Sequence, residues 1–128
     1  MTLVHIVLFK FKPGVTKEQG EAFVREVKSL KGLSCVKDGR LFVGGPSLTD
    51  PIEYSRGHQY VCLSYHENLA ALDQFQVDKE KSRDNLPFAD PLDYETLCRF
   101  DFDVAPEDEY MCGFGPLVGK ILGNGSSD

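Results

Sequence analysis

The residues best suited to proton-transfer chemistry are His5, His58 and Tyr60. His5 is the one polar side chain in the apolar run 3–9, and His58 and Tyr60 lie two positions apart in a predicted strand over 58–65, so they share a face. A histidine can act as a base near neutral pH, and a tyrosine hydroxyl can donate a hydrogen bond to a developing enolate oxygen. These three residues are therefore the predicted catalytic groups. The competing interpretation of His5 is a buried neutral imidazole held by one or two hydrogen bonds.

Cys62 and Arg99 are two further residues whose side chains could take part in catalysis or substrate binding. Cys62 points with His58 and Tyr60, but a nucleophilic thiol needs a base and a third, orienting group, so we expect it to line a pocket. Arg99 is predicted to face the helices from the last strand, where a guanidinium can bind a substrate carboxylate. The alternative for Arg99 is an ion pair with Asp101 or with an acidic helix residue.

A buried central strand is expected to position His5, because the run 3–11 is apolar at almost every position. Strand alternation divides its residues between two faces, with His5, Val7 and Phe9 on one and Val4, Ile6 and Leu8 on the other. Neither face suits water. We expect the helices of the chain to cover the first face and a second copy of the sheet to cover the other.

Two helices are predicted from capping signals and apolar periodicity. A capping box over 16–19 opens a helix predicted over 17–31, with Phe23, Val27 and Leu30 as its buried stripe. Asn68 is the predicted cap of a second helix, whose inward residues are Leu69, Leu72 and Phe75. The polar run 78–84 that follows is predicted to be a solvated turn or the end of this helix.

Three more strands complete the predicted fold, over 40–44, 58–65 and 96–104. The order β-α-β-β-α-β predicts an α+β, ferredoxin-like domain, with a four-stranded antiparallel sheet and two helices on one face. The second face of such a sheet carries Ile6, Leu8, Val61 and Leu63, and this apolar surface predicts a sheet-to-sheet homodimer.

The chain is expected to form one domain over 1–104 and a C-terminal tail over 105–128. The tail opens with an acidic linker and continues with apolar residues between glycines. It is either a flexible tail or an arm that packs Met111, Phe114, Leu117 and Ile121 on its own domain or on a partner.

Composition narrows the classes of partner. A formal charge of −6 and an isoelectric point near 5.0 argue against nucleic acid or an anionic membrane surface, since both attract clustered Lys and Arg. The four cysteines are scattered and have no metal-ligand spacing, so we expect free thiols and no metal site. The first strand lacks the basic leader and cleavage site of a signal peptide, so a cytoplasmic protein is expected.

A small-molecule pocket is predicted between the sheet and the two helices, because side chains of one strand parity meet the inward residues of the helices there. Its expected substrate-binding residues are Val7, Phe9, Phe23, Val27, Cys62, Phe75, Leu97 and Arg99. Such a lining suits a flat, largely apolar ligand.

The run Val4–Gly14, followed by a Thr-capped helix, resembles the stress-responsive A/B barrel (dimeric α+β barrel) domain family, and the likeness covers about 2–104. The resemblance implies a ferredoxin-like protomer, a sheet-to-sheet homodimer and a pocket between sheet and helices. It also implies an activity similar to that of cofactor-independent polyketide cyclases, although the family includes members with no settled activity.

The catalytic pattern of the cyclising members is matched only in part. His5 matches their strand-one histidine, whereas Tyr60 replaces the histidine of a G-x-x-H pattern and Phe75 replaces a helix tyrosine. Residues 78–81 replace the H-P-x-H run, so the cyclase mechanism does not transfer as it stands. The expected function is a cofactor-independent lyase, isomerase or cyclase acting on a polyketide-like or aromatic small molecule. The alternative is a non-catalytic small-molecule-binding or stress-response protein.

Overall fold

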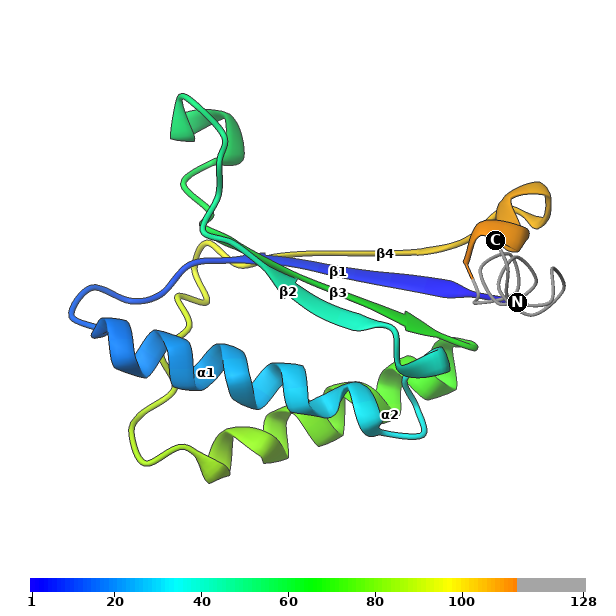
Figure 1. The fold of residues 1–128 in the computed structure, drawn as a ribbon, viewed down its shortest axis with the longest axis horizontal. Helices are drawn as coiled ribbons and strands as arrows, with labels where there is room; N and C mark the ends of the chain where they lie inside the picture. Colours follow the sequence, from blue (N-terminus) through cyan, green and yellow to red (C-terminus); the bar gives the residue numbers. More distant parts are fainter. Residues whose placement is uncertain (113–128) are drawn as a thin grey trace, which may run out of the picture.

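Four antiparallel strands and two helices form two layers in the computed structural model, which describes residues 1–112 (Figure 1). The elements are β1 (Leu3–Phe9), α1 (Lys17–Ser29), β2 (Leu41–Gly44), β3 (Tyr60–His66), α2 (Leu69–Ser82) and β4 (Cys98–Asp103). Both helices lie on the same face of the sheet. The ferredoxin-like α+β fold predicted from the sequence is thereby confirmed.

The first strand is central, as its apolar character on both faces predicts. The strand order is β2-β3-β1-β4, so β1 pairs with β3 on one side and with β4 on the other. Val7 stands opposite Cys62 of β3 and opposite Arg99 of β4. Residues far apart in the sequence are therefore neighbours across β1, and they face the helices together.

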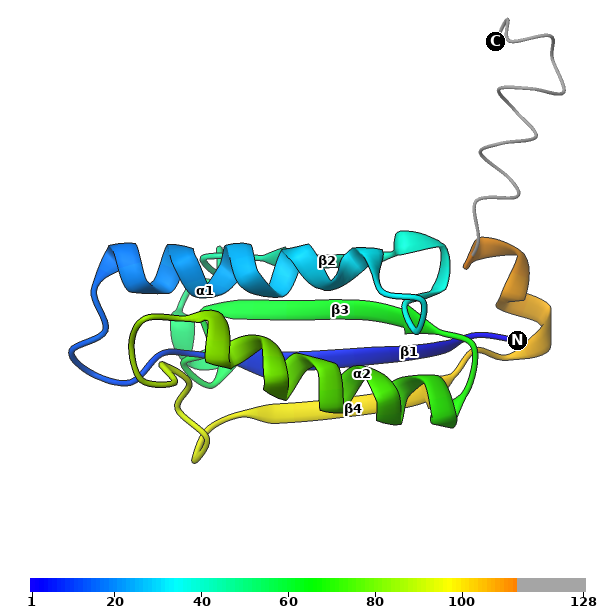
Figure 2. The same ribbon diagram turned by 90° about the horizontal axis from the view of Figure 1, so that it is seen from below.

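The first helix begins as its sequence predicts. The Thr16 side chain accepts a hydrogen bond from the backbone N–H of Gln19, and the Gln19 side chain accepts one from the backbone N–H of Thr16. The predicted stripe of Phe23, Val27 and Leu30 is buried. From below, α1 runs along β2 and β3, and α2 runs along β1 and β4 (Figure 2).

The second helix extends into the polar run 78–84. Asn68 caps it as predicted, by accepting a hydrogen bond from the backbone N–H of Ala71, but the helix continues to Ser82. Most of the run 78–84 is therefore helical; of the two alternatives predicted for it, the helix end is confirmed and the turn is wrong. The helical period matters for function, because it brings Lys79 to the inner side of α2, one turn after the buried Phe75.

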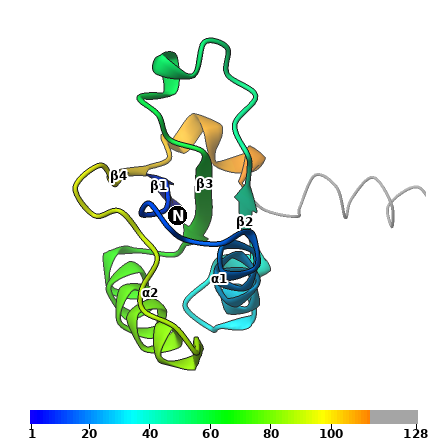
Figure 3. The ribbon, with the colours of Figure 1, turned by 90° about the vertical axis from the view of Figure 1, so that its left-hand side faces the viewer.

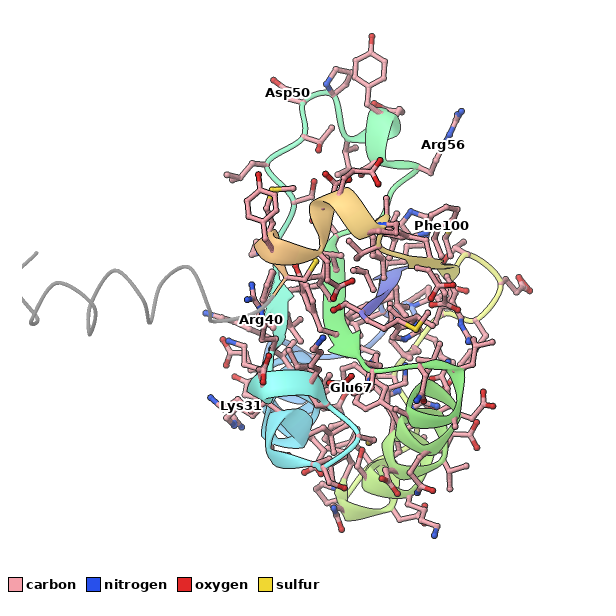
Figure 4. All side chains as sticks on the ribbon, turned by 90° about the vertical axis from the view of Figure 1, so that its right-hand side faces the viewer. Lys31, Arg40, Asp50, Arg56, Glu67 and Phe100 are labelled. Carbon is pink, nitrogen blue, oxygen red and sulfur yellow. The ribbon has the colours of Figure 1, made fainter. Side chains whose placement is uncertain are left out.

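The face of the sheet opposite the helices is apolar and uncovered in the protomer. Leu8 is 37% exposed, Phe42 55% and Phe100 62%. The view along the sheet shows the two helices on one side and the loop between β2 and β3 rising from the other (Figure 3). Asp50 and Arg56 lie on this projecting loop (Figure 4).

The segment after β4 returns to the start of the chain. Residues Pro106–Met111 form a 3-10 helix beside the N-terminus (Figure 1). The Thr2 hydroxyl donates a hydrogen bond to the Glu109 carboxylate, which lies 3.5 Å from the Lys37 ammonium. Met111 is 54% exposed, and the other residues of the proposed packing arm, namely Phe114, Leu117 and Ile121, lie outside the described part of the chain.

Within residues 1–112, none of the helices combines the length and the apolar composition that crossing a membrane requires.

Candidate functional site

His5 lies in the middle of the molecule and is fully buried. Its Nδ1 is 2.5 Å from Oδ1 of Asp101, the residue directly opposite it on β4. An ionised carboxylate has no proton to give, so Nδ1–H of the neutral ring donates and Nε2 keeps its lone pair. The other carboxylate oxygen of Asp101 accepts a hydrogen bond from Arg99 Nε at 2.7 Å. Arg99 and Asp101 thus fix the orientation of the imidazole.

Lys79 completes this line of polar groups from the opposite layer. Its Nζ, carried by α2, lies 3.4 Å from Nε2 of His5, close enough to donate a hydrogen bond to the ring. It also lies 5.3 Å from the centre of the Phe75 ring. Among residues 1–112, no carboxylate oxygen lies within 4.0 Å of this ammonium group.

The environment keeps His5 neutral at physiological pH. Burial lowers the pKa of His5 to about 4, and the hydrogen bond to Asp101, which acts in the opposite direction, does not offset this effect. Burial alone would raise the pKa of Asp101, but hydrogen bonds from His5 and Arg99 outweigh it and hold that pKa below its ordinary value. The pair at neutral pH is therefore an aspartate and a neutral imidazole.

The ammonium of Lys79 is destabilised by the same surroundings. Burial lowers its pKa from 10.5 to about 8, and the positive charges of Arg83 and Arg99 act in the same direction. About a tenth of Lys79 is then a free amine at pH 7, far more than of an ordinary lysine. A free amine is both a base and a nucleophile, which an ordinary surface lysine is not.

A cavity of about 230 Å³ opens beside Lys79, between the sheet and the helices. Its apolar walls are Val7, Phe9, Phe23, Val27, Cys62, Leu92 and Leu97, and its polar walls are Gln76, Lys79, Glu80, Arg83, Tyr94 and Arg99. Seven of the eight residues expected to line the pocket line this cavity. The eighth, Phe75, is fully buried and packs edge-on against His5, with the ring centres 6.0 Å apart.

His5 itself is not part of the cavity wall. Lys79 reaches the cavity, and His5 and Asp101 lie behind it. A ligand in the cavity therefore contacts Lys79 rather than His5 or Asp101. The line Asp101–His5–Lys79 is built like a hydrogen-bonded triad, with an orienting carboxylate, a central imidazole and a terminal reactive group.

Tyr60 and His58 are not at this site, so the expectation that they converge with His5 is wrong. Tyr60 pairs with Phe9, four residues along β1 from His5, which is about 13 Å at the usual rise of a strand. The two nitrogens of His58 face the backbone oxygens of Ser55 and Thr96, at 2.7 and 2.5 Å. His58 thus ties the projecting loop to the segment before β4.

Tyr60 and His58 line a second cavity, of about 420 Å³, beneath the loop that joins β2 and β3. Leu8 and Val61 of the uncovered sheet face also line it. Its position, away from His5 and Lys79, separates it from the polar line described above.

Cys62 lines the main cavity but is poorly suited to act as a nucleophile. Burial raises the pKa of its thiol to about 11, against a smaller opposing effect of the Lys79 charge. The thiolate is therefore scarce near neutral pH. Cys62 serves as a wall of the cavity, as its sequence context suggests.

His66 and Lys79 are among the residues of this region that the sequence interpretation did not assign to the site. His66 is fully buried near the end of β3, where Nδ1 lies 2.7 Å from the Cys35 backbone oxygen and Nε2 lies 2.8 Å from the Ser64 hydroxyl. Extending the predicted strand by one residue would have placed it on the same face as Ser64. Continuing the stripe of Leu72 and Phe75 by one helical turn would have found Lys79.

Among residues 1–112, no group of three or more His, Cys, Asp or Glu side chains is arranged to hold a metal ion. The line of Asp101, His5 and Lys79 ends in an amine, which in its protonated form opposes a bound cation.

The sequence matches the family model described as Stress responsive A/B Barrel Domain over residues 3–102. No curated protein sequence matches the chain.

Solved structures with the same fold are remote in sequence. A hydroxynitrile lyase from Passiflora edulis is 14% identical, with a TM-score of 0.65, and the match covers 82% of this chain and 94% of that one. A dimeric ferredoxin-like protein of unknown function from Thermobifida fusca is 16% identical, with a TM-score of 0.58 and coverage of 81% and 92%. A Dabb family protein with a ferredoxin-like fold from Mesorhizobium loti is 11% identical, with a TM-score of 0.59 and coverage of 81% and 97%.

Proposed function

The chain belongs to the stress-responsive A/B barrel domain family, and from that premise we propose that it is a cofactor-independent lyase, isomerase or cyclase acting on a small carbonyl compound. The observation that carries the proposal is the line Asp101–His5–Lys79, which ends in an amine at the wall of the cavity. Buried, hydrogen-bonded titratable groups at a cavity are typical of acid–base catalysis.

Lys79 is the catalytic residue in this proposal. As a free amine it takes a proton from the substrate, and as an ammonium it donates a hydrogen bond to the oxygen that becomes negative. His5 and Asp101 are positioning residues, because they act on the substrate through Lys79. The Nε2 lone pair of His5 accepts a hydrogen bond from the ammonium, and Asp101 holds the ring in the tautomer that leaves this lone pair free.

The cavity favours a substrate about as large as a single substituted aromatic ring. Its volume of about 230 Å³ lies just below the range of roughly 300–1,000 Å³ that is usual for sites of drug-sized ligands. The walls from β1, β3 and α1 are apolar, whereas α2 and Arg99 of β4 supply polar and charged side chains. The hydroxynitrile lyase from Passiflora edulis supports carbon–carbon lyase chemistry on this fold. Ring closure of a short polyketide-like chain requires the same base and the same hydrogen-bond donor.

The proposal is tested with two probes and one matched pair of variants. Cleavage of mandelonitrile, an aromatic cyanohydrin, is followed by the absorbance of benzaldehyde, and exchange of the acidic protons of benzoylacetone in D₂O is followed by NMR. We expect the wild-type protein to accelerate at least one reaction, with a rate that rises with pH until Lys79 is deprotonated at about 8.

Lys79→Met should reduce the accelerated rate by roughly a hundred- to ten-thousand-fold, the range for loss of a general base. Lys81→Met is the control, because Lys81 lies on the same helix but is exposed. Equal rates for the two variants would remove Lys79 from the mechanism. Binding of benzoylacetone without acceleration of either reaction would favour the alternative, a non-catalytic binding protein.

The uncovered sheet face supports a homodimer as the functional unit. Leu8, Phe42 and Phe100 expose apolar surface there, and the Thermobifida fusca protein of the same fold is dimeric. Sedimentation equilibrium should give twice the protomer mass. Leu8→Glu should yield monomers or unfolded chains, since burying an unpaired carboxylate costs several kcal/mol. Val77→Glu, on the exposed side of α2, should leave the dimer intact. A monomeric wild-type protein would contradict the proposal.

A further inference from the structure

Lys79 differs from the other cations of the cavity in having no anionic partner. Arg99 Nε lies 2.7 Å from Asp101, and Arg83 Nη1 lies 3.4 Å from Asp90. No such carboxylate is within 4.0 Å of Lys79 in the described part of the chain. Its nearest polar neighbour is instead a neutral imidazole. Lys79 also lines the cavity, so a compound that enters it comes close to a lysine whose amine has no anionic partner.

The geometry leads us to propose that Lys79 forms an imine with an aldehyde or ketone that also carries a carboxylate, and that this carboxylate binds at Arg83. The inference rests on the proposed function and deepens it. It names a covalent role for the same residue, and it names the substrate class as an oxo acid small enough for the cavity.

The covalent step needs no reagent beyond the amine and the carbonyl compound. The Nζ lone pair attacks the carbonyl carbon, a C–N bond forms, and the electrons of the C=O π bond move to oxygen. The nitrogen loses a proton to Nε2 of His5, and the oxygen gains it, giving a carbinolamine. A second proton transfer releases the hydroxyl as water and leaves C=N. One amine and one carbonyl thus give one imine and one water, and His5 ends as it began.

His5 is placed to carry these protons. Its Nε2 lies 3.4 Å from Nζ, and Asp101 at Nδ1 stabilises the imidazolium during the transfer. The imine, once protonated, withdraws electrons from the adjacent carbon, so that loss of a proton or breakage of a carbon–carbon bond there becomes easier. This is the electronic requirement shared by lyases, isomerases and aldol-type cyclases.

The carboxylate site is argued from Arg83. It follows Lys79 by four residues, so their side chains leave neighbouring turns about 5–6 Å apart. Arg83 lines the cavity, and its Nη1 donates to the Tyr94 hydroxyl at 2.5 Å. Its Nε is buried and has no hydrogen-bond partner in the described part of the chain. A buried donor left without a partner is costly, and a substrate carboxylate would satisfy it.

4-Formylbenzoate is the probe, because its para carbonyl and carboxylate carbons lie about 6 Å apart, close to the spacing of side chains one helical turn apart. The full chain is incubated with the probe and sodium cyanoborohydride at about pH 7, which reduces an imine to a stable amine. Cleavage after glutamate gives the peptide 68–80, in which Lys79 is the only lysine. Mass spectrometry of this peptide locates the carboxybenzyl group.

We expect Lys79 to be labelled first. At pH 7, lowering the pKa from 10.5 to about 8 raises the fraction of free amine roughly 300-fold relative to a surface lysine. Lys81, in the next peptide, serves as an internal comparison, and Lys79→Arg, which keeps the charge but cannot form an imine, should remain unlabelled in the corresponding peptide. Labelling spread over surface lysines without preference for Lys79 would overturn the imine.

The carboxylate site has its own comparison. 4-Formylbenzoate should label Lys79 at least about tenfold faster than benzaldehyde does, the ratio for about 1.4 kcal/mol of binding. Arg83→Gln should remove the difference, whereas Arg25→Gln on the exposed side of α1 should not. Equal rates with both aldehydes in the wild-type protein would overturn the oxo-acid assignment.

The outcomes separate this inference from the proposed function. Accelerated benzoylacetone exchange or mandelonitrile cleavage, without selective labelling of Lys79, leaves the enzyme and overturns the imine. Selective labelling of Lys79, without acceleration of mandelonitrile cleavage or benzoylacetone exchange, supports the imine. It contradicts the acid–base role proposed for Lys79 in those two reactions.

Discussion

The helix-facing side of β1 has two ends that differ in kind. At the polar end, His5 connects Asp101 to Lys79 through hydrogen bonds. At the aromatic end, four rings pack together, those of Phe9, Phe11, Phe23 and Tyr60, with centres 5.2–5.8 Å apart. The cavity lies between the two ends and takes walls from both.

The aromatic end stabilises the domain, and the polar end carries its reactive groups. Rings at these separations gain packing energy. The polar end keeps an imidazole and an amine whose pKa values are both lowered by burial, which costs stability but leaves reactive groups. We therefore expect variants at the aromatic end to change stability, and variants at the polar end to change its pH dependence and the chemistry.

Phe23→Ala should have the largest effect on stability. Phe23 is buried and packs edge-on against Phe9 and Phe11. Its truncation should lower the free energy of unfolding by about 3–5 kcal/mol. Urea unfolding at several pH values measures this loss, which should be the same at each because no titrating group is removed. A loss that changes strongly with pH would show that the two ends are coupled.

His5→Asn should act mainly through pH. The pKa of His5 is about 4 in the folded protein and 6.5 in the reference state, so the unfolded chain binds more protons between these values. The wild-type protein therefore loses stability as pH falls from 6.5 to 4, by roughly 2–3 kcal/mol from this residue.

In His5→Asn the contribution of His5 to this loss of stability should disappear. The contribution of His66 should remain, because burial also lowers the pKa of His66. Urea midpoints at about pH 4.5, 5.5 and 7 give the slope. Identical slopes for the two proteins would mean that His5 is protonated as readily in the folded chain as in the unfolded one.

The fold could be predicted because its signals are local. The fold signals are the continuous apolar run 3–9, the capping box of Thr16 and Gln19, and the stripe of Phe23, Val27 and Leu30. Each depends on neighbours within a few positions. The inward position of Lys79 was not predicted for the same reason. A polar run such as 78–84 gives no apolar period, and only the tertiary structure shows that one lysine in it faces inward.

The site could be predicted only in part, because it depends on contacts across the sheet. Arg99 was expected to face the helices and to pair with Asp101 or bind a substrate; it lines the cavity and also pairs with Asp101. The contact of Asp101 with His5 follows from the pairing of β1 with β4, which are separated by most of the chain. Strand parity gives the face of a residue but not its position along the strand.

Tyr60→Phe is the variant for which we expect the smallest effect. It tests most directly whether the chemistry is confined to the polar end of the site. If Tyr60 served the polar end, loss of its hydroxyl would slow turnover by at least tenfold. Tyr60 instead stacks on Phe9, at 5.6 Å between ring centres, and the phenylalanine ring keeps that contact. We expect the free energy of unfolding to change by less than about 0.5 kcal/mol, and the rates of mandelonitrile cleavage and benzoylacetone exchange to stay within about twofold of wild type. A tenfold slower reaction at unchanged stability would mean that the aromatic end contributes a hydroxyl to the chemistry, and that the substrate spans the cavity from Lys79 to Tyr60.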